Sequence, residues 1–229
     1  MSLDLVQHCG AQREIFATGK AGRAISIADL PCGDALLHAL GPCQDLDGEI
    51  TVLRGEPYVS KVRGGDYIVD RGTGHGAIFL VWTRQAKWRE AAVPASVTTY
   101  VELQSFIRNE AEQCGIDISG AFPFLLSGTP TQIRWHINVD RTGGKPVTRE
   151  LFQQSKQSYV LRGEPVEIIG FYSERHTGVF ISQYAPAIDT AKGEQNFMHL
   201  HFVSRAGRAT GHIDDLRLEG PATLRLPAR

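Results

Sequence analysis

The chain has 229 residues, of which 42% are hydrophobic and 21% are charged, and its formal net charge is -1. This length allows one large domain or two small, closely packed ones, and the composition is that of a folded globular protein. A near-zero net charge with both signs scattered along the chain argues against a nucleic-acid-binding protein, which usually carries a basic excess.

Neither a signal peptide nor a membrane span is expected from the sequence. Residues 1–16 contain too many polar side chains for the hydrophobic core of a signal peptide. The longest apolar run, Ala77–Trp82, is far shorter than the roughly 20 residues of a membrane helix. The four cysteines show neither close pairing nor metal-ligand spacing. We therefore expect a cytoplasmic protein that acts without a membrane or nucleic acid.

Most of the chain is predicted to form β-strands, because short runs rich in β-branched and aromatic residues alternate with Gly, Asp and Asn. In chain order, the expected strands are Glu49–Leu53, Pro57–Val62, Asp66–Val69, Ala77–Trp82, Phe122–Ser127, Gln132–Val139, Val166–Tyr172, Gly178–Gln183, Met198–Val203 and Ala222–Leu226.

Helical signals are few. The spacing of three leucines predicts a helix over Cys32–Leu40. A second helix, Thr99–Cys114, begins with a capping box formed by Thr99 and Glu102. A third, Arg149–Lys156, is short.

Many strands with a few segregated helices predict an α+β fold. The stretch 114–121 has the weakest pattern, so we divide the chain there into an N-terminal α+β sheet subdomain, 1–118, and a C-terminal β-rich subdomain, 119–229. A compact two-sheet protein of this size is also compatible with a homodimer.

Three histidines near the C-terminus are candidate metal ligands. Side chains alternate along a strand, so His199 and His201 point to one side, about 7 Å apart along the strand. The following Ser, Arg and Gly residues are typical of a hairpin loop that brings His212 alongside. The three imidazoles could then bind one divalent ion on one side and leave positions open for water or substrate.

The same pattern has a plainer interpretation. A histidine on a strand is more often a hydrogen-bonded residue than a ligand, and His-x-His arises by chance in a chain with eight histidines. Imidazole also suits several metals, so zinc, iron, manganese, nickel and copper all stay open, with zinc preferred.

The segment from His199 to Leu216 resembles the metal-binding hairpin of acetolactate decarboxylases, which carry His-Leu-His-Phe, a polar turn and Gly-Gly-His. Upstream, Leu46-Asp47-Gly48-Glu49 is similar to the family's Leu-Asp-Gly-Glu strand. The segments 53–58 and 161–171 are similar to a family hairpin and to the strand that precedes the histidines. The order and spacing agree over roughly residues 28–216.

This resemblance implies two packed sheets of mixed or antiparallel strands with a metal site between them. It places Glu49 near the metal, as a fourth ligand or as an acid/base that acts through bound water. The alternative for Glu49 is a hairpin-turn carboxylate that faces solvent. The implied reaction is decarboxylation of a 2-hydroxy-3-keto acid through a metal-bound enediolate, followed by protonation.

Three departures from the family pattern bear on the substrate. His136 stands where the family has an arginine, and Arg134 lies two residues earlier on the same strand face. Either residue could act on the substrate, or both could be ordinary strand residues. Pro42 replaces a threonine, and the sequence reaches Arg229 without the family's acidic tail, which supplies a second glutamate.

Three functions are therefore weighed from the sequence. The first is a metal-dependent lyase resembling acetolactate decarboxylase, which acts on a small molecule. The second is a divergent enzyme that uses the same site for isomerisation, cyclisation, hydration or dehydration of another small oxygenated substrate. The third is a non-catalytic metal-binding module. Glu49 beside three histidines favours an enzyme, because a protein without chemistry has little need for four such polar residues, three of which are expected to be buried at a cost.

Overall fold

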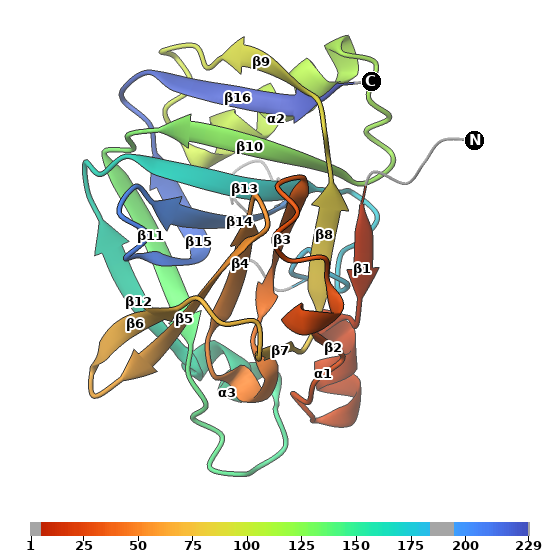
Figure 1. The fold of residues 1–229 in the computed structure, drawn as a ribbon, viewed down its shortest axis with the longest axis vertical. Helices are drawn as coiled ribbons and strands as arrows, with labels where there is room; N and C mark the ends of the chain where they lie inside the picture. Colours follow the sequence, from red (N-terminus) through yellow and green to blue (C-terminus); the bar gives the residue numbers. More distant parts are fainter. Residues whose placement is uncertain (1–5, 184–194, 229) are drawn as a thin grey trace.

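Two antiparallel β-sheets pack face to face in the computed structural model, which describes residues 6–183 and 195–228 (Figure 1). The six-stranded sheet has the order β1 (Gln7–Cys9), β8 (Leu80–Arg84), β3 (Leu37–Pro42), β4 (Glu49–Leu53), β5 (Glu56–Arg63), β6 (Asp66–Asp70). The eight-stranded sheet has the order β12 (Lys156–Leu161), β11 (Gln132–Asn138), β15 (Thr210–Arg217), β14 (Met198–Ser204), β13 (Val166–Tyr172), β10 (Phe122–Gly128), β16 (Ala222–Pro227), β9 (Trp88–Ala92).

The remaining elements are short apart from one helix. They are the strand pair β2 (Ile25–Ser26) and β7 (Gly76–Ala77), the helices α1 (Gln12–Thr18), α2 (Tyr100–Gln113) and α3 (Arg149–Gln154), and the 3-10 turns η1 (Ile27–Asp29) and η2 (Gln44–Leu46). The expected α+β architecture with two packed sheets is confirmed. Most expected strands are present with bounds that differ by a residue or so, as are the helices predicted from Thr99 and from Arg149.

The chain passes from the first sheet to the second between Arg84 and Trp88, because β9 pairs with β16. The expected division between subdomains at 118–119 groups β9 and α2 with the N-terminal sheet. In the structure, β9 belongs to the eight-stranded sheet and α2 packs on that sheet. The two subdomains, 1–118 and 119–229, stay a prediction.

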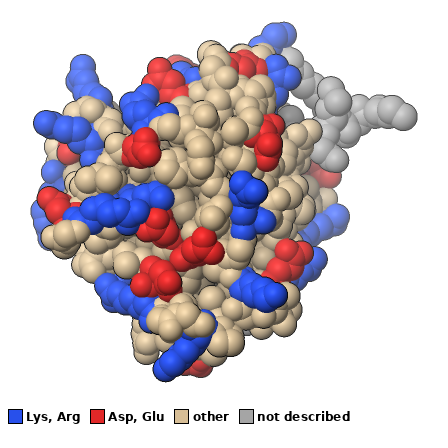
Figure 2. All heavy atoms as spheres, turned by 60° about the horizontal axis from the view of Figure 1, so that its bottom comes forward, with Lys and Arg blue, Asp and Glu red and all other residues tan. Residues whose placement is uncertain are grey.

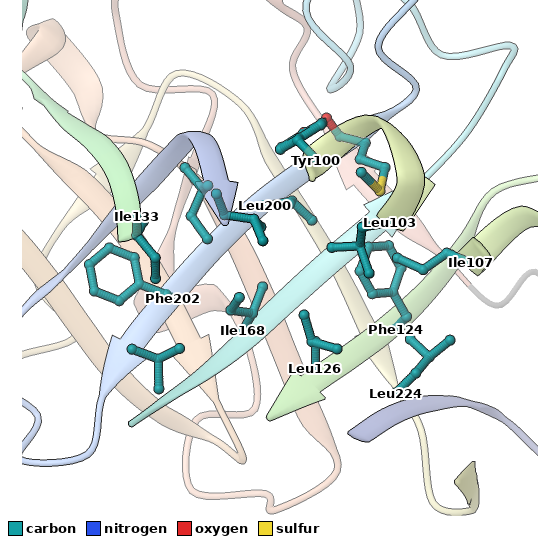
Figure 3. Close-up of a cluster of buried hydrophobic side chains, with 14 of the residues drawn as sticks. Tyr100, Leu103, Ile107, Phe124, Leu126, Ile133, Ile168, Leu200, Phe202 and Leu224 are labelled. Atoms are coloured by element: carbon teal, nitrogen blue, oxygen red, sulfur yellow. The ribbon is translucent and has the colours of Figure 1, made fainter. Parts of the chain in front are cut away.

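Apolar side chains cover both faces of the eight-stranded sheet. On its outer face, Tyr100, Leu103 and Ile107 of α2 pack over strand residues that include Phe124 and Leu224 (Figure 3). On its inner face, residues such as Ile169 of β13 join Leu40 and Val81 of the six-stranded sheet in one cluster. Burial of this apolar surface is the main force that holds the two sheets together.

Side-chain alternation explains how polar groups come to lie between the sheets. On β14, Leu200 and Phe202 point into the outer cluster, so His199 and His201 point toward the six-stranded sheet. On β4, Ile50 and Val52 belong to the cluster on the far side of the six-stranded sheet. Residues 49 and 51 therefore face the histidines across the gap between the sheets.

The predicted helix over Cys32–Leu40 is wrong. Gly33 has a φ of 93°, which interrupts a helix, and Leu37 donates a backbone hydrogen bond to Asp34 in a turn. Strand β3 then begins at Leu37 and is buried along its whole length. Because both faces of this strand are covered, its apolar residues do not alternate, and their spacing imitates that of a helix.

The predicted strand over Gly178–Gln183 is also wrong. The amide of Gly178 donates to the carbonyl of Ile181 within a turn, and Gly178 has a φ of 76°. Phe180 and Ile181 are buried in the cluster between the sheets, so the apolar run reflects a buried loop. The expected strand Ala77–Trp82 is divided between β7 and β8, which lie in different sheets.

Charges on the surface are mixed. On the face that Figure 2 shows, Lys and Arg side chains are interspersed with Asp and Glu side chains. Within residues 6–183 and 195–228, each helix is too short or too polar to span a bilayer.

Candidate metal centre

The hairpin of β14 and β15 brings the three predicted histidines together. His201 lies directly opposite His212 in the strand register, and His199 precedes His201 by two residues on the same face. The ring centroids are 5.1 Å apart for His199 and His201, 4.8 Å for His199 and His212, and 5.6 Å for His201 and His212. One nitrogen from each ring lies within 4.8 Å of the others, so the three can hold one metal ion.

The two histidines of β14 are oriented through Nδ1. His199 donates from Nδ1 to the carbonyl of Phe180 at 2.7 Å, and a 3.1 Å hydrogen bond joins His201 Nδ1 to Thr51 Oγ1. Thr51 in turn accepts a hydrogen bond from the hydroxyl of Thr210 at 2.9 Å. These contacts leave Nε2 of both rings available for another partner. In metal sites, a hydrogen bond at one ring nitrogen commonly orients the histidine whose other nitrogen binds the metal.

The environment also selects the neutral imidazole that binds metals. Burial lowers the pKa of His199 to about 3, although its hydrogen bond to Phe180 opposes the shift. Burial also lowers the pKa of His201 and His212 well below the usual range, and the neighbouring histidines add to the effect. The rings therefore carry no proton that a metal ion would have to displace at neutral pH.

Glu49 of β4 lies across the gap, only 2% exposed. Its Oε2 is 3.5 Å from His201 Nε2, and its Oε1 is 4.0 Å from His136 Nε2. Burial raises the pKa of Glu49 well above its usual range, and Asp214 adds to the shift. The alternative of a solvent-facing turn residue is thus wrong, because β4 begins at Glu49 and points this side chain between the sheets.

His136 and Arg134 both lie on β11 and line the same cavity, of about 650 Å³, as Glu49 and His199. His136 is buried and pairs in register with His212, and their ring centroids are 4.7 Å apart. Burial lowers the pKa of His136, and a hydrogen bond to Asp214 opposes the shift. Arg134 is exposed at the cavity wall, beside a bulge that shifts the register after it.

The donor set fits a divalent transition metal. His201 Nε2 is buried and has no hydrogen-bond partner within residues 6–183 and 195–228, which is costly unless another group occupies the site. Three neutral imidazoles with a nearby carboxylate are ligands that suit zinc and several related ions. His136, His212 and Asp214 form a second group that could hold a metal, adjacent to the first.

This chain is similar to known proteins in its structure and not in its sequence. No protein-family model matches the sequence, and no curated protein matches it. The structure of alpha-acetolactate decarboxylase from Bacillus subtilis strain 168 superimposes with a TM-score of 0.76 and 15% identity, over 98% of this chain and 85% of that chain. This chain has the alpha-acetolactate decarboxylase fold.

Two further solved structures match the same fold. Acetolactate decarboxylase from Bacillus subtilis subspecies spizizenii matches with a TM-score of 0.73 and 16% identity, over 98% of this chain and 86% of that chain. A Staphylococcus aureus protein of unknown function, described as similar to alpha-acetolactate decarboxylase, matches with a TM-score of 0.74 and 15% identity, over 96% and 84% of the two chains. The expected resemblance is confirmed in the fold, at low sequence identity.

Within this acetolactate decarboxylase fold, sequence reasoning missed three residues of the site. Asp214 bonds to His136, Thr51 supports His201, and Lys156 lines the cavity. The alternation of strand residues points to Asp214, which lies two residues after His212, and to Thr51, two residues after Glu49. No alternation pattern points to Lys156, because the sequence predicts this residue to be the end of the helix Arg149–Lys156, whereas the structure places it at the start of strand β12.

Proposed function

We propose that the chain is a metal-dependent lyase that decarboxylates a 2-hydroxy-3-keto acid, as its acetolactate decarboxylase fold suggests. The observation that carries this proposal is the convergence of three buried or half-buried histidines on one point opposite the buried Glu49. Such a group of polar residues costs free energy in a protein interior unless it binds something. The cavity beside it has room for a small-molecule substrate.

In this proposal His199, His201 and His212 hold the ion, with Glu49 as a further ligand or as an acid/base. Zinc is the first choice, and other divalent transition metals share these ligands. When bound, a divalent ion supplies a Lewis acid that stabilises negative charge as it develops on substrate oxygens.

The remaining steps fall to side chains of the cavity. Arg134 adds an exposed positive charge to the cavity wall, which attracts an acidic substrate toward the site. His136 is held by Asp214 so that its Nε2 faces Glu49, where it can move a proton. Glu49 is the second candidate for that proton, because burial raises the pKa of its carboxyl well above the usual range.

One observation favours a different reaction at the same site. The pair of His136 and Asp214 resembles an acid/base pair, since the carboxylate fixes the tautomer of the imidazole. A group of this kind also serves isomerisation, cyclisation, hydration or dehydration of another small oxygenated substrate. A non-catalytic metal-binding module is the third candidate, and a homodimer stays a prediction.

Two measurements test the proposal together. Metal analysis of the purified protein should find about one zinc or related ion per chain, as expected for one site of three histidines. The metal-loaded protein should convert racemic acetolactate to acetoin. Metal binding without acetoin formation would reject the decarboxylase and favour the alternative reactions, and absence of metal binding would reject all of these enzymatic functions.

A further inference from the structure

Lys156 places a positive charge in the wall of the cavity that contains the histidines. It is the first residue of β12 and lies directly opposite Asn138 of β11. Both residues line the cavity together with Glu49, His136 and His199. The Lys156 ammonium lies 5.7 Å from the ring centroid of Phe152, so an aromatic side chain covers part of it.

This ammonium has no acidic partner among the residues that the structure describes. The two carboxylates whose charges act on Lys156 lie beside histidines: Asp214 accepts a hydrogen bond from His136 at 2.8 Å, and Glu49 lies 3.5 Å from His201. Burial lowers the pKa of Lys156, while Asp214 and Glu49 oppose the shift. Lys156 is half-buried, and a cation in that position without a counter-ion is stabilised by an anion that enters the cavity.

Lys156 is better placed than the other cations of the cavity to receive that anion beside the histidines. Arg134 and Arg217 also line the cavity, but both are exposed. Lys156 lines the same cavity as Glu49, His136 and His199, and its charge acts on these groups through space. An anion held by Lys156 therefore lies within electrostatic reach of the metal centre.

Asn138 adds a second polar group to the same corner. Its side chain is 2% exposed and its Oδ1 is buried without a hydrogen-bond partner among the described residues. Because Asn138 lines the cavity, its unpaired carbonyl oxygen is the group of this residue that can accept a hydrogen bond from a ligand hydroxyl. The ammonium of Lys156 and the amide of Asn138 thus match a carboxylate and a hydroxyl on neighbouring carbons.

We propose that Lys156 and Asn138 form the subsite that binds the carboxylate and the hydroxyl of a 2-hydroxy acid substrate. The proposal rests on the proposed function for its chemistry, and it names Lys156, rather than Arg134, as the residue that selects for a carboxylate. Lys156 is a binding residue in this role, and its loss changes affinity for the acid rather than for the metal.

Binding of an unreactive acid tests Lys156. Calorimetry would compare 2-hydroxy-2-methylpropanoate with the neutral 2-hydroxy-2-methylpropanamide, on zinc-loaded and on metal-free protein. The wild type should prefer the acid, and Lys156→Met should lose about tenfold or more in affinity for the acid alone, as for one charge-assisted hydrogen bond. Lys156→Arg should keep most of the preference.

Lys145→Met provides the matched control, because Lys145 is an exposed loop residue. It should bind both compounds as the wild type does, and all variants should retain zinc. In metal-free protein, Asn138→Leu should abolish the preference for the hydroxy acid over 2,2-dimethylpropanoate, which lacks the hydroxyl.

The outcomes separate this inference from the proposed function. Equal affinity of wild type and Lys156→Met for the acid would overturn the role of Lys156, and loss of acid binding in Arg134→Met alone would assign that role to Arg134. Failure of the wild type to bind zinc would contradict the proposed function. The comparison of acid and amide on metal-free protein would still decide the role of Lys156.

Discussion

His136 donates a hydrogen bond from Nδ1 to Oδ1 of Asp214 at 2.8 Å, and this bond determines which ring nitrogen faces the cavity. The opposite nitrogen, Nε2, is 4.0 Å from Oε1 of Glu49. His199 is oriented in the same way by the carbonyl of Phe180. His136 is therefore held in a single tautomer by the protein.

Asp214→Asn should weaken this control of His136. An amide can present its NH₂ group to the ring, so the tautomer with the proton on Nε2 becomes populated. We expect nitrogen NMR of histidine-labelled protein to detect that tautomer, and acetoin formation to fall about tenfold or more. Asp215→Asn, at the neighbouring position in the same cavity, is the control and should leave the His136 signals unchanged. Unaltered His136 signals in Asp214→Asn would refute the prediction.

His199→Ala and His201→Ala should each remove the metal, because two remaining imidazoles hold an ion weakly compared with three. Zinc analysis after dialysis measures the loss directly. Added zinc should also raise the midpoint of thermal unfolding of the wild type and not that of the variants, since only a bound ion stabilises the folded state. His75→Ala, whose ring contacts Asp70 outside the site, should respond to zinc as the wild type does. Full zinc loading of the double variant would contradict the assignment of the ligands.

The histidine triad could be predicted from sequence because local rules determine it. Alternation along one strand places His199 and His201 on one face, and a hairpin returns His212 beside them. The position of Glu49 required the family resemblance, since it joins a strand of the other sheet and no local pattern reveals that contact.

The remaining parts of the site depend on contacts between sheets and on strand register. Lys156 meets Asn138 only because β12 pairs with β11 in one register. Strand β3 was also hidden from sequence patterns by its packing. Both of its faces are covered, so it lacks the alternation of polar and apolar residues that identifies a strand. Sequence patterns predict single elements well, but the pairing of Lys156 with Asn138 and the burial of β3 depend on how one element packs on another.

The capping box of α2 was predicted from sequence and is present, with Thr99 accepting from the amide of Glu102 and Glu102 accepting from the amide of Thr99. Thr99→Ala should lower the free energy of unfolding by about 1 kcal/mol, because it leaves an amide at the helix start without its partner. Urea unfolding at neutral pH measures the change. Ser105→Ala, at an exposed position within the helix, should be neutral or slightly stabilising. An equal loss in both variants would exclude capping as the cause.

Acid should destabilise the protein partly through His38, which is buried in β3 against Trp88 with ring centroids 5.7 Å apart. Burial, with the nearby Arg54, lowers the pKa of His38 to about 4, against an ordinary value of 6.5. Between these two values the unfolded chain binds a proton that the folded chain does not. Stability therefore falls as the pH falls from 6.5 to about 4, by up to roughly 3 kcal/mol from this residue.

His38→Gln removes the titrating group while keeping a polar side chain of similar length. The free energy of unfolding, measured in urea from pH 7 down to pH 4.5, should fall less steeply for this variant than for the wild type. The buried histidines of the metal centre titrate in both proteins, so the difference between the two slopes reports His38 alone. Because the variant also changes packing against Trp88, its stability at pH 7 can differ from that of the wild type, but that offset does not alter the slope. Parallel pH profiles would show that His38 is protonated in the folded protein as easily as in the unfolded chain.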